Sequence, residues 1–208
     1  MNTLSLREHI EDVKGDFGLM DSHVICLQET WLNSKEETFE RYDFPDHNVI
    51  FNSVGRGKGI ITLYSDEFGF VADVKHRDFQ MTRIESSLFS IINVYRSAQA
   101  DSAFITSLVN QIDLQNNVIV CGDFNFCSLE QQEHEIGKHL KSLGFVQLVK
   151  DATHREGRSL DHVYIYQKAS TFSTSCTTRG CYYSDHDQVE LLVNCGTEEE
   201  YSDSCLKL

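Results

Sequence analysis

The sequence predicts an α+β sandwich. Short apolar runs typical of buried strands are numerous, and most of them follow one another directly along the chain. Apolar residues at helical spacing occur in only a few segments between these runs. Consecutive strands with interspersed helices favour a layered α+β domain over a regular alternation of strands and helices.

The predicted strands are apolar runs bounded by polar or glycine-containing segments. Alternation of polar and apolar residues is clearest in the run that Asp161 opens. The predicted strands cover residues 24–27, 48–51, 59–64, 70–74, 88–94, 118–121, 160–166 and 189–193.

Helical spacing predicts helices over residues 6–13, 103–112 and 130–143. Gly144 follows the last of them and suits a C-terminal cap, because glycine readily adopts the left-handed conformation that ends many helices.

One packed domain is expected over residues 1–195. A chain of 208 residues with 40% apolar and 24% charged residues can bury a core of ordinary size. The chain has a single proline, Pro45, and no Pro- or Ser-rich linker. Residues 196–208 are acidic and lack periodicity, so we expect them to form a disordered tail.

The seven cysteines are expected to be reduced thiols in an intracellular protein. The first residues lack the basic and apolar regions of a signal peptide, and no apolar run approaches the roughly 20 residues that span a bilayer. Neither Cys121/Cys127 nor Cys176/Cys181 has the short spacing of a zinc knuckle, so no structural zinc and no membrane contact are expected.

The net charge of −14 argues against a protein that covers nucleic acid with positive charge. It leaves open an enzyme with a local basic rim. Arg155 and Arg158 lie just before Asp161 and are predicted to contact a substrate phosphate. The glycine-bearing segment 55–59 favours a hairpin turn over a Walker loop, because Gly and not Ser or Thr follows Lys58.

Polar residues that can carry chemistry follow the ends of several predicted strands. Taken singly, none of these residues indicates a functional site, since an Asp after a strand is usually a turn former or a helix cap. Together at one sheet edge, these carboxylates would repel one another unless a cation or protons neutralised them. Oxygen ligands of this kind suit Mg²⁺. The residues are Glu29, Tyr95, Asp123, Asn125, Asp161, Asp185 and His186.

Four short motifs, in this order, resemble the endonuclease/exonuclease/phosphatase superfamily, which includes deoxyribonuclease I, abasic-site endonucleases and retroelement endonuclease domains. The resemblance spans residues 2–193. Within the superfamily, the sequence looks most similar to the endonuclease domains of mobile elements. The motifs are Leu27-Gln28-Glu29-Thr30, Gly122-Asp123-Phe124-Asn125, Leu160-Asp161-His162-Val163-Tyr164 and Ser184-Asp185-His186.

The resemblance implies a four-layered α/β sandwich of two packed, mainly antiparallel sheets flanked by helices. It also implies metal-dependent hydrolysis of phosphate esters with Mg²⁺, or Mn²⁺ as a substitute. By matching position, Glu29, Asp185 and Asn2 lie at the metal, Asp123 activates water, and Asn125 holds the phosphate or the nucleophile. Asp161 is implied to pair with His186, while His186 and Tyr95 contact the phosphate.

Two departures from the family pattern matter. Only Met1 precedes Asn2, so the family's first strand is expected to be truncated. Leu4 stands where some abasic-site enzymes carry a further metal-binding carboxylate.

Three functions follow as hypotheses. The first is a Mg²⁺-dependent DNA endonuclease, which would place the protein in the nucleus. The second is a phosphatase or phosphodiesterase for a small phosphate ester, and the third is a non-catalytic relic or interaction domain.

Overall fold

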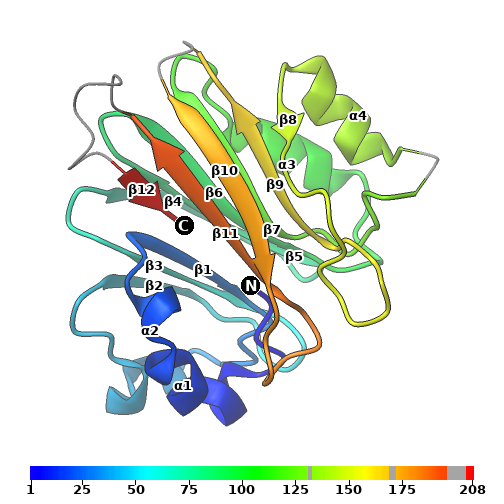
Figure 1. Cartoon of the computed structure of the whole chain (residues 1–208). Coiled ribbons are helices and arrows are strands. Elements are labelled where there is room, and N and C mark those ends of the chain that lie inside the picture. Colours follow the sequence, from blue (N-terminus) through cyan, green and yellow to red (C-terminus); the bar gives the residue numbers. More distant parts are fainter. Residues whose placement is uncertain (131–132, 169–171, 196–204) are drawn as a thin grey trace.

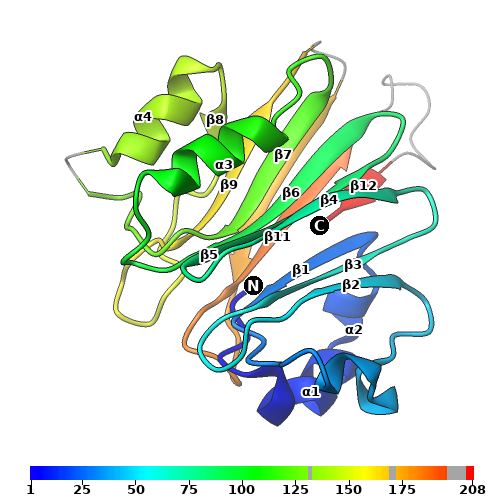
Figure 2. The ribbon, with the colours of Figure 1, turned by 180° about the vertical axis from the view of Figure 1, so that it is seen from behind.

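The chain folds as a sandwich of β-sheets with helices on both outer faces (Figure 1). The computed structural model describes residues 1–130, 133–168, 172–195 and 205–208. A six-stranded sheet faces two three-stranded sheets, with α1 (Leu6–Gly15) and α2 (Phe17–Met20) outside one face. Helices α3 (Ala103–Gln111) and α4 (Glu135–Ser142) lie outside the other face, as Figure 2 shows. The four-layered α+β sandwich is therefore confirmed.

The six-stranded sheet has the order β4-β5-β6-β7-β9-β8. Its neighbours pair antiparallel except for β6 and β7, which are parallel. The strands are β4 (Gly69–Lys75), β5 (Phe79–Glu85), β6 (Phe89–Arg96), β7 (Asn117–Asp123), β8 (Val146–Gln147) and β9 (Asp161–Tyr166).

The two smaller sheets have the orders β1-β3-β2 and β10-β11-β12, and all their pairs are antiparallel. The short 3-10 helices η1 (Glu36–Thr38) and η2 (Glu40–Tyr42) connect β1 to β2. The strands are β1 (Val24–Gln28), β2 (Asn48–Asn52), β3 (Ile60–Tyr64), β10 (Ser173–Arg179), β11 (Gln188–Asn194) and β12 (Cys205–Lys207).

Successive residues of the central strands serve opposite faces of the sheet. Ile91 of β6 and Ile119 of β7 belong to the core between the sheets, whereas Ile92 and Val118 belong to the core beneath α3 and α4. A third core packs α1 against β1 and β3. Strands buried on both faces read as continuous apolar runs, which is why these strands were predictable.

A fully buried polar network joins the sheets near the end of β1. Gln28 Nε2 donates to Asn93 Oδ1 on β6 at 2.6 Å, and Asn93 Nδ2 donates to Thr62 Oγ1 on β3 at 3.0 Å. Hydrogen bonds inside the core fix the two sheets relative to each other, because an unpaired buried amide would cost free energy. These hydrogen bonds therefore hold in place the edge of the sandwich at which β1, β6 and β7 end, which is called the rim below.

The sequence analysis did not predict four strands, which are β5, β8, β10 and β12. β10 is made of polar and β-branched residues with alternating exposure, and it lies at the edge of its sheet. β5 alternates apolar residues with Gln80 and Thr82, which are fully buried all the same. Neither β5 nor β10 contains an apolar run, so the criterion that found the other long strands missed them, and β8 has only two residues.

The last predicted helix starts later than expected, and its predicted C-terminal cap is observed. The helix predicted over residues 130–143 begins at Glu135, where the side chain of His134 accepts the N–H of Ile136 and caps the first turn. The predicted cap at Gly144 is confirmed by its φ of 93°.

The disordered tail predicted over residues 196–208 is wrong at its end. Cys205–Lys207 form β12, which pairs with β11, and Leu206 is buried in the core between the sheets. Residues 196–204 lie outside the described residues.

The start of the chain pairs with β1. Gln28 donates its N–H to the carbonyl of Met1, and Thr3 donates its N–H to the carbonyl of Gln28, so the short first segment runs parallel to β1. A cavity of about 300 Å³, lined by Met1 and Leu208 among others, lies between β1 and β11. In the described part of the chain, no helix is both long and apolar enough to cross a membrane.

Candidate active site

Asp123 is the buried centre of the candidate site. It ends β7, has no exposed surface and follows Gly122, whose φ is 137°. A Cβ on Gly122 would lie 1.9 Å from the carbonyl oxygen of Val94 on β6. Only glycine therefore allows β7 to pass β6 closely enough to place Asp123 at this rim.

Two asparagines hold the Asp123 carboxylate. Asn2 Nδ2 donates to Oδ2 at 2.9 Å, and Asn125 donates its backbone N–H to Oδ1 at 2.9 Å and its Nδ2 to Oδ2 at 3.2 Å. Burial, followed by the negative charge of Asp161, raises the pKa of Asp123 to about 7, against the lowering effects of His186 and of these hydrogen bonds. The carboxylate is thus fixed in position and poised to exchange a proton near neutral pH.

His186 and Asp161 form the predicted pair. His186 Nδ1 donates to Asp161 Oδ2 at 2.7 Å, and both side chains are more than nine-tenths buried. Burial would lower the pKa of His186, but the hydrogen bond to Asp161 and the charges of Asp161, Asp123 and Asp185 raise it to about 9. Burial would raise the pKa of Asp161, but its hydrogen bond and charge interaction with His186 hold it below the ordinary value. The pair is therefore ionised at neutral pH, with a positive imidazole at the rim.

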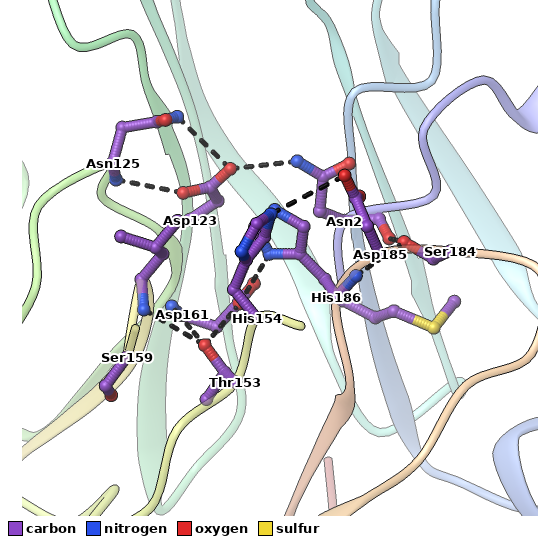
Figure 3. Close-up of polar contacts among 12 residues, drawn as sticks. Asn2, Asp123, Asn125, Thr153, His154, Ser159, Asp161, Ser184, Asp185 and His186 are labelled. Atoms are coloured by element: carbon purple, nitrogen blue, oxygen red, sulfur yellow. Dashed lines mark hydrogen bonds and ion pairs between the residues drawn. The ribbon is translucent and has the colours of Figure 1, made fainter. Parts of the chain in front are cut away.

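Figure 3 shows these side chains gathered at one place, although they come from distant parts of the sequence. Ser184 Oγ donates to the carbonyl of Asn2 at 2.8 Å and accepts the N–H of His186 at 3.0 Å. Ser184 thereby ties the loop that carries His186 to the start of the chain.

Thr153 is a buried site residue that sequence analysis missed. Its Oγ1 donates to Asp161 Oδ2 at 2.7 Å and accepts the backbone N–H groups of Leu160 and Asp161, each at 3.0 Å. A Thr eight residues before an Asp is no recognised pattern, so no signal in the sequence could have found it.

His154 is the second missed residue. Its Nε2 lies 3.5 Å from Asp185 Oδ2, and its ring meets the His186 ring edge-on with centroids 4.8 Å apart. His154 stands directly beside Thr153, but only the folded hairpin brings it to the rim.

Glu29 and Tyr95 meet at the same rim, at the ends of β1 and β6. Tyr95 donates its hydroxyl to Glu29 Oε1 at 3.4 Å and to the carbonyl of Gly57 at 3.1 Å. Trp31 Nε1 donates to the other oxygen of Glu29 at 3.3 Å. Burial and the negative charge of Glu29 raise the pKa of Tyr95, so the phenol stays protonated.

The carboxylates fit a divalent cation. Asp161 Oδ1 and Asp185 Oδ1 are buried and have no hydrogen-bond partner. Buried carboxylate oxygens without partners are costly, and a cation with oxygen ligands removes that cost. Among the described residues, the only group of three or more His, Cys, Asp or Glu side chains close enough to share an ion is His154, Asp185 and His186. The predicted ligand Glu29 lies outside this group, beside Tyr95.

The backbone around the site is strained. Among the described residues, the non-glycine residues with positive φ are Leu4, Ser5, Glu29, Trp31 and Asn125. Leu4 and Ser5 follow Asn2, and Ser5 donates its N–H to the carbonyl of Glu29. Left-handed conformations of such residues cost free energy and concentrate at functional sites.

Arg155 and Arg158 lie exposed on the hairpin that follows Thr153. Arg158 forms an ion pair with Glu156 at 2.7 Å. Arg155 donates its backbone N–H to the carbonyl of Asp185 at 2.9 Å, so the hairpin is joined to the loop of His186. Their contact with a phosphate stays a prediction.

The family model of the endonuclease/exonuclease/phosphatase family matches residues 1–186. The chain belongs to that family. The family contains hydrolases that act on phosphate esters. No match was found among curated proteins.

Solved structures of the family share the fold. An AP endonuclease from Archaeoglobus fulgidus has a TM-score of 0.72 at 15% identity, over 94% of this chain and 97% of that one. The catalytic domain of APE2 from Xenopus laevis has a TM-score of 0.69 at 16% identity, over 100% and 91%. A 3′ phosphatase from Neisseria bound to a product DNA hairpin has a TM-score of 0.65 at 16% identity, over 94% and 97%.

Proposed function

We propose that this family member is a divalent-metal-dependent DNA endonuclease. The observation that carries the proposal is a fully buried Asp123, held by Asn2 and Asn125, beside a buried ion pair of Asp161 and His186. Burying so many ionisable groups is expensive, and a purely structural rim has no need of them. Hydrolysis of an anionic ester uses each of them.

Asp123 is proposed to orient the attacking water and to accept its proton. A general base works best when its pKa lies near the operating pH, and burial places the pKa of Asp123 at about 7. The two asparagines keep the carboxylate in one orientation, so little reorganisation is needed as the water attacks.

His186 is proposed to donate a hydrogen bond from Nε2 to the scissile phosphate. Nδ1 is committed to Asp161, which leaves the other ring nitrogen for substrate. A charged imidazole is a stronger donor than a neutral one, and Asp161 keeps it charged. Asn125 and the protonated hydroxyl of Tyr95 are proposed to contact further oxygens of the phosphate or the nucleophile.

Glu29, Asp185 and Asn2 are the proposed residues for Mg²⁺, with Mn²⁺ as a substitute. When bound, the cation neutralises the charge that grows on the phosphate oxygens and the leaving group. Asp185 offers a buried oxygen without a partner. Asn2 Oδ1 accepts the N–H of Leu4 at 3.0 Å and retains a second lone pair.

DNA is the proposed substrate, and nuclear localisation is proposed with it. Arg56 lies over the ring of Trp31 at 5.6 Å, and Trp31 donates to Glu29, so a positive group stands near the Glu29 carboxylate. Together with the exposed Arg155 and Arg158 on the hairpin that follows Thr153, Arg56 is proposed to contact the phosphate backbone. The strongly negative net charge favours a small phosphate ester as the second candidate, because a small substrate needs fewer positive contacts.

The test is nicking of supercoiled plasmid by the purified chain with Mg²⁺, with EDTA, and with Asp123→Asn. Asp151→Asn is a matched control, because Asp151 is exposed and the chemical change is the same. We expect nicking that needs Mg²⁺, survives in Asp151→Asn and is lost in Asp123→Asn.

Absence of nicking by a chain that circular dichroism shows to be folded would refute the endonuclease proposal. Activity on a panel of small phosphate esters would then favour the second candidate. Inactivity on both would favour a non-catalytic domain.

A further inference from the structure

His154 lies on a tight hairpin that packs against the loop of Asp185 and His186. Thr153 and His154 both donate their N–H groups to the carbonyl of Arg158 at 2.9 Å, which closes the hairpin. The imidazole side chain is only 9% exposed. A polar ring buried on a hairpin of exposed residues needs partners, and these identify its role.

The hydrogen bonds of His154 fix which ring nitrogen carries the proton. Nδ1 accepts the backbone N–H of Glu156 at 3.2 Å, so Nδ1 is an acceptor. In the neutral ring the proton then lies on Nε2. Nε2 is the nitrogen that faces Asp185 Oδ2, at 3.5 Å.

Backbone contacts keep this arrangement together. Arg155 donates its N–H to the carbonyl of Asp185 at 2.9 Å, and Asp187 donates its N–H to the carbonyl of Thr153 at 2.8 Å. The His154 ring also meets the His186 ring at an interplanar angle of 80°. The hairpin and the loop are therefore positioned as one unit.

We propose that His154 is a positioning residue that holds Asp185 in the orientation in which it binds the divalent cation. The inference rests on the proposed function. The Nε2–H group of His154 faces Oδ2 of Asp185 and leaves Oδ1, which is buried and has no partner, for the cation. A residue that orients a metal ligand in this way typically changes metal affinity about 10- to 100-fold when it is replaced.

The test is binding of Mn²⁺ alone, measured by electron paramagnetic resonance on the whole chain without substrate. His154→Phe keeps a ring of similar size against His186 but removes the N–H group. We expect its Mn²⁺ affinity to fall about 10-fold. His139→Phe on α4 is the matched control and should bind Mn²⁺ as the unmodified chain does. In nicking assays of His154→Phe, the Mg²⁺ concentration that gives half of the maximal rate should rise by a larger factor than the maximal rate falls.

Unchanged Mn²⁺ affinity in a folded His154→Phe chain would overturn the proposal. Asp185→Asn tests the premise separately and should weaken Mn²⁺ binding. If it does not, the positioning role fails because the cation does not use Asp185, whereas Mg²⁺-dependent nicking by the unmodified chain would still support the proposed function.

Discussion

Thr153 satisfies three buried polar groups, and replacing it with valine should destabilise the fold markedly. Valine has nearly the same shape but has no hydroxyl. Thr153→Val therefore removes the hydrogen bond to the Asp161 carboxylate and leaves the N–H groups of Leu160 and Asp161 without an acceptor. All of these groups are buried, so water cannot replace the hydroxyl.

The expected loss can be worked out from these contacts. A hydrogen bond to a charged group contributes about 1.5–3 kcal/mol, and each buried N–H without a partner costs about 1–3 kcal/mol. Partial relaxation of the hairpin reduces the sum, and we expect Thr153→Val to lower the free energy of unfolding by about 4 kcal/mol. Thr153→Ser keeps the hydroxyl and removes one buried methyl, so it should cost only about 1 kcal/mol.

Urea unfolding followed by circular dichroism and by the fluorescence of Trp31 measures both values. The comparison of the two variants separates the effect of the hydroxyl from that of the methyl group. A valine variant that is no less stable than the serine variant would refute the claim that the hydrogen bonds of Thr153 stabilise this rim.

Three further predictions concern the site and its surroundings. Gly122→Ala should unfold the chain or abolish hydrolysis, because the new Cβ would lie 1.9 Å from the carbonyl oxygen of Val94. Circular dichroism measures the folding of the variant, and plasmid nicking measures its activity. A stable, active variant would show that β7 does not need glycine at this position. Burial lowers the pKa of His162 from 6.5 to about 4, so the unfolded chain binds a proton that the folded chain does not. Stability should therefore fall by about 3 kcal/mol as the pH drops from about 6.5 to about 4, and His162→Gln should flatten this dependence in urea titrations. Asp161→Asn should lower the pKa of His186 from about 9 towards its ordinary value. An NMR titration of the histidines in the presence of EDTA measures this pKa. An unchanged pKa would mean that Asp161 is not the main partner of His186.

The sequence predicted the strands that consist of continuous apolar runs, together with the residues at their ends. β6 and β7 contain continuous apolar runs, so their ends, and with them Tyr95 and Asp123, could be located before the fold was known. β5 and β10 alternate polar with other residues and were missed. Polar residues at buried positions, such as Gln80 and Thr82 of β5, conceal a strand from any criterion based on apolar runs.

The family resemblance implied the pairing of Asp161 with His186, but the pKa shifts of the site were beyond prediction, because they depend on burial and on contacts between distant segments. Asp123 and Asp161 are both Asp residues near a strand end, yet the pKa of Asp123 is raised and that of Asp161 is lowered. The difference is the neighbour of each: Asp161 faces the ring of His186, whereas Asp123 faces the amides of two asparagines. Amides orient a carboxylate without neutralising it, while an imidazolium cation stabilises its charge. One carboxylate can thus exchange protons near neutral pH while the other stays ionised, and this division of roles arises only when the hairpin of Thr153, the loop of His186 and the start of the chain meet at one rim.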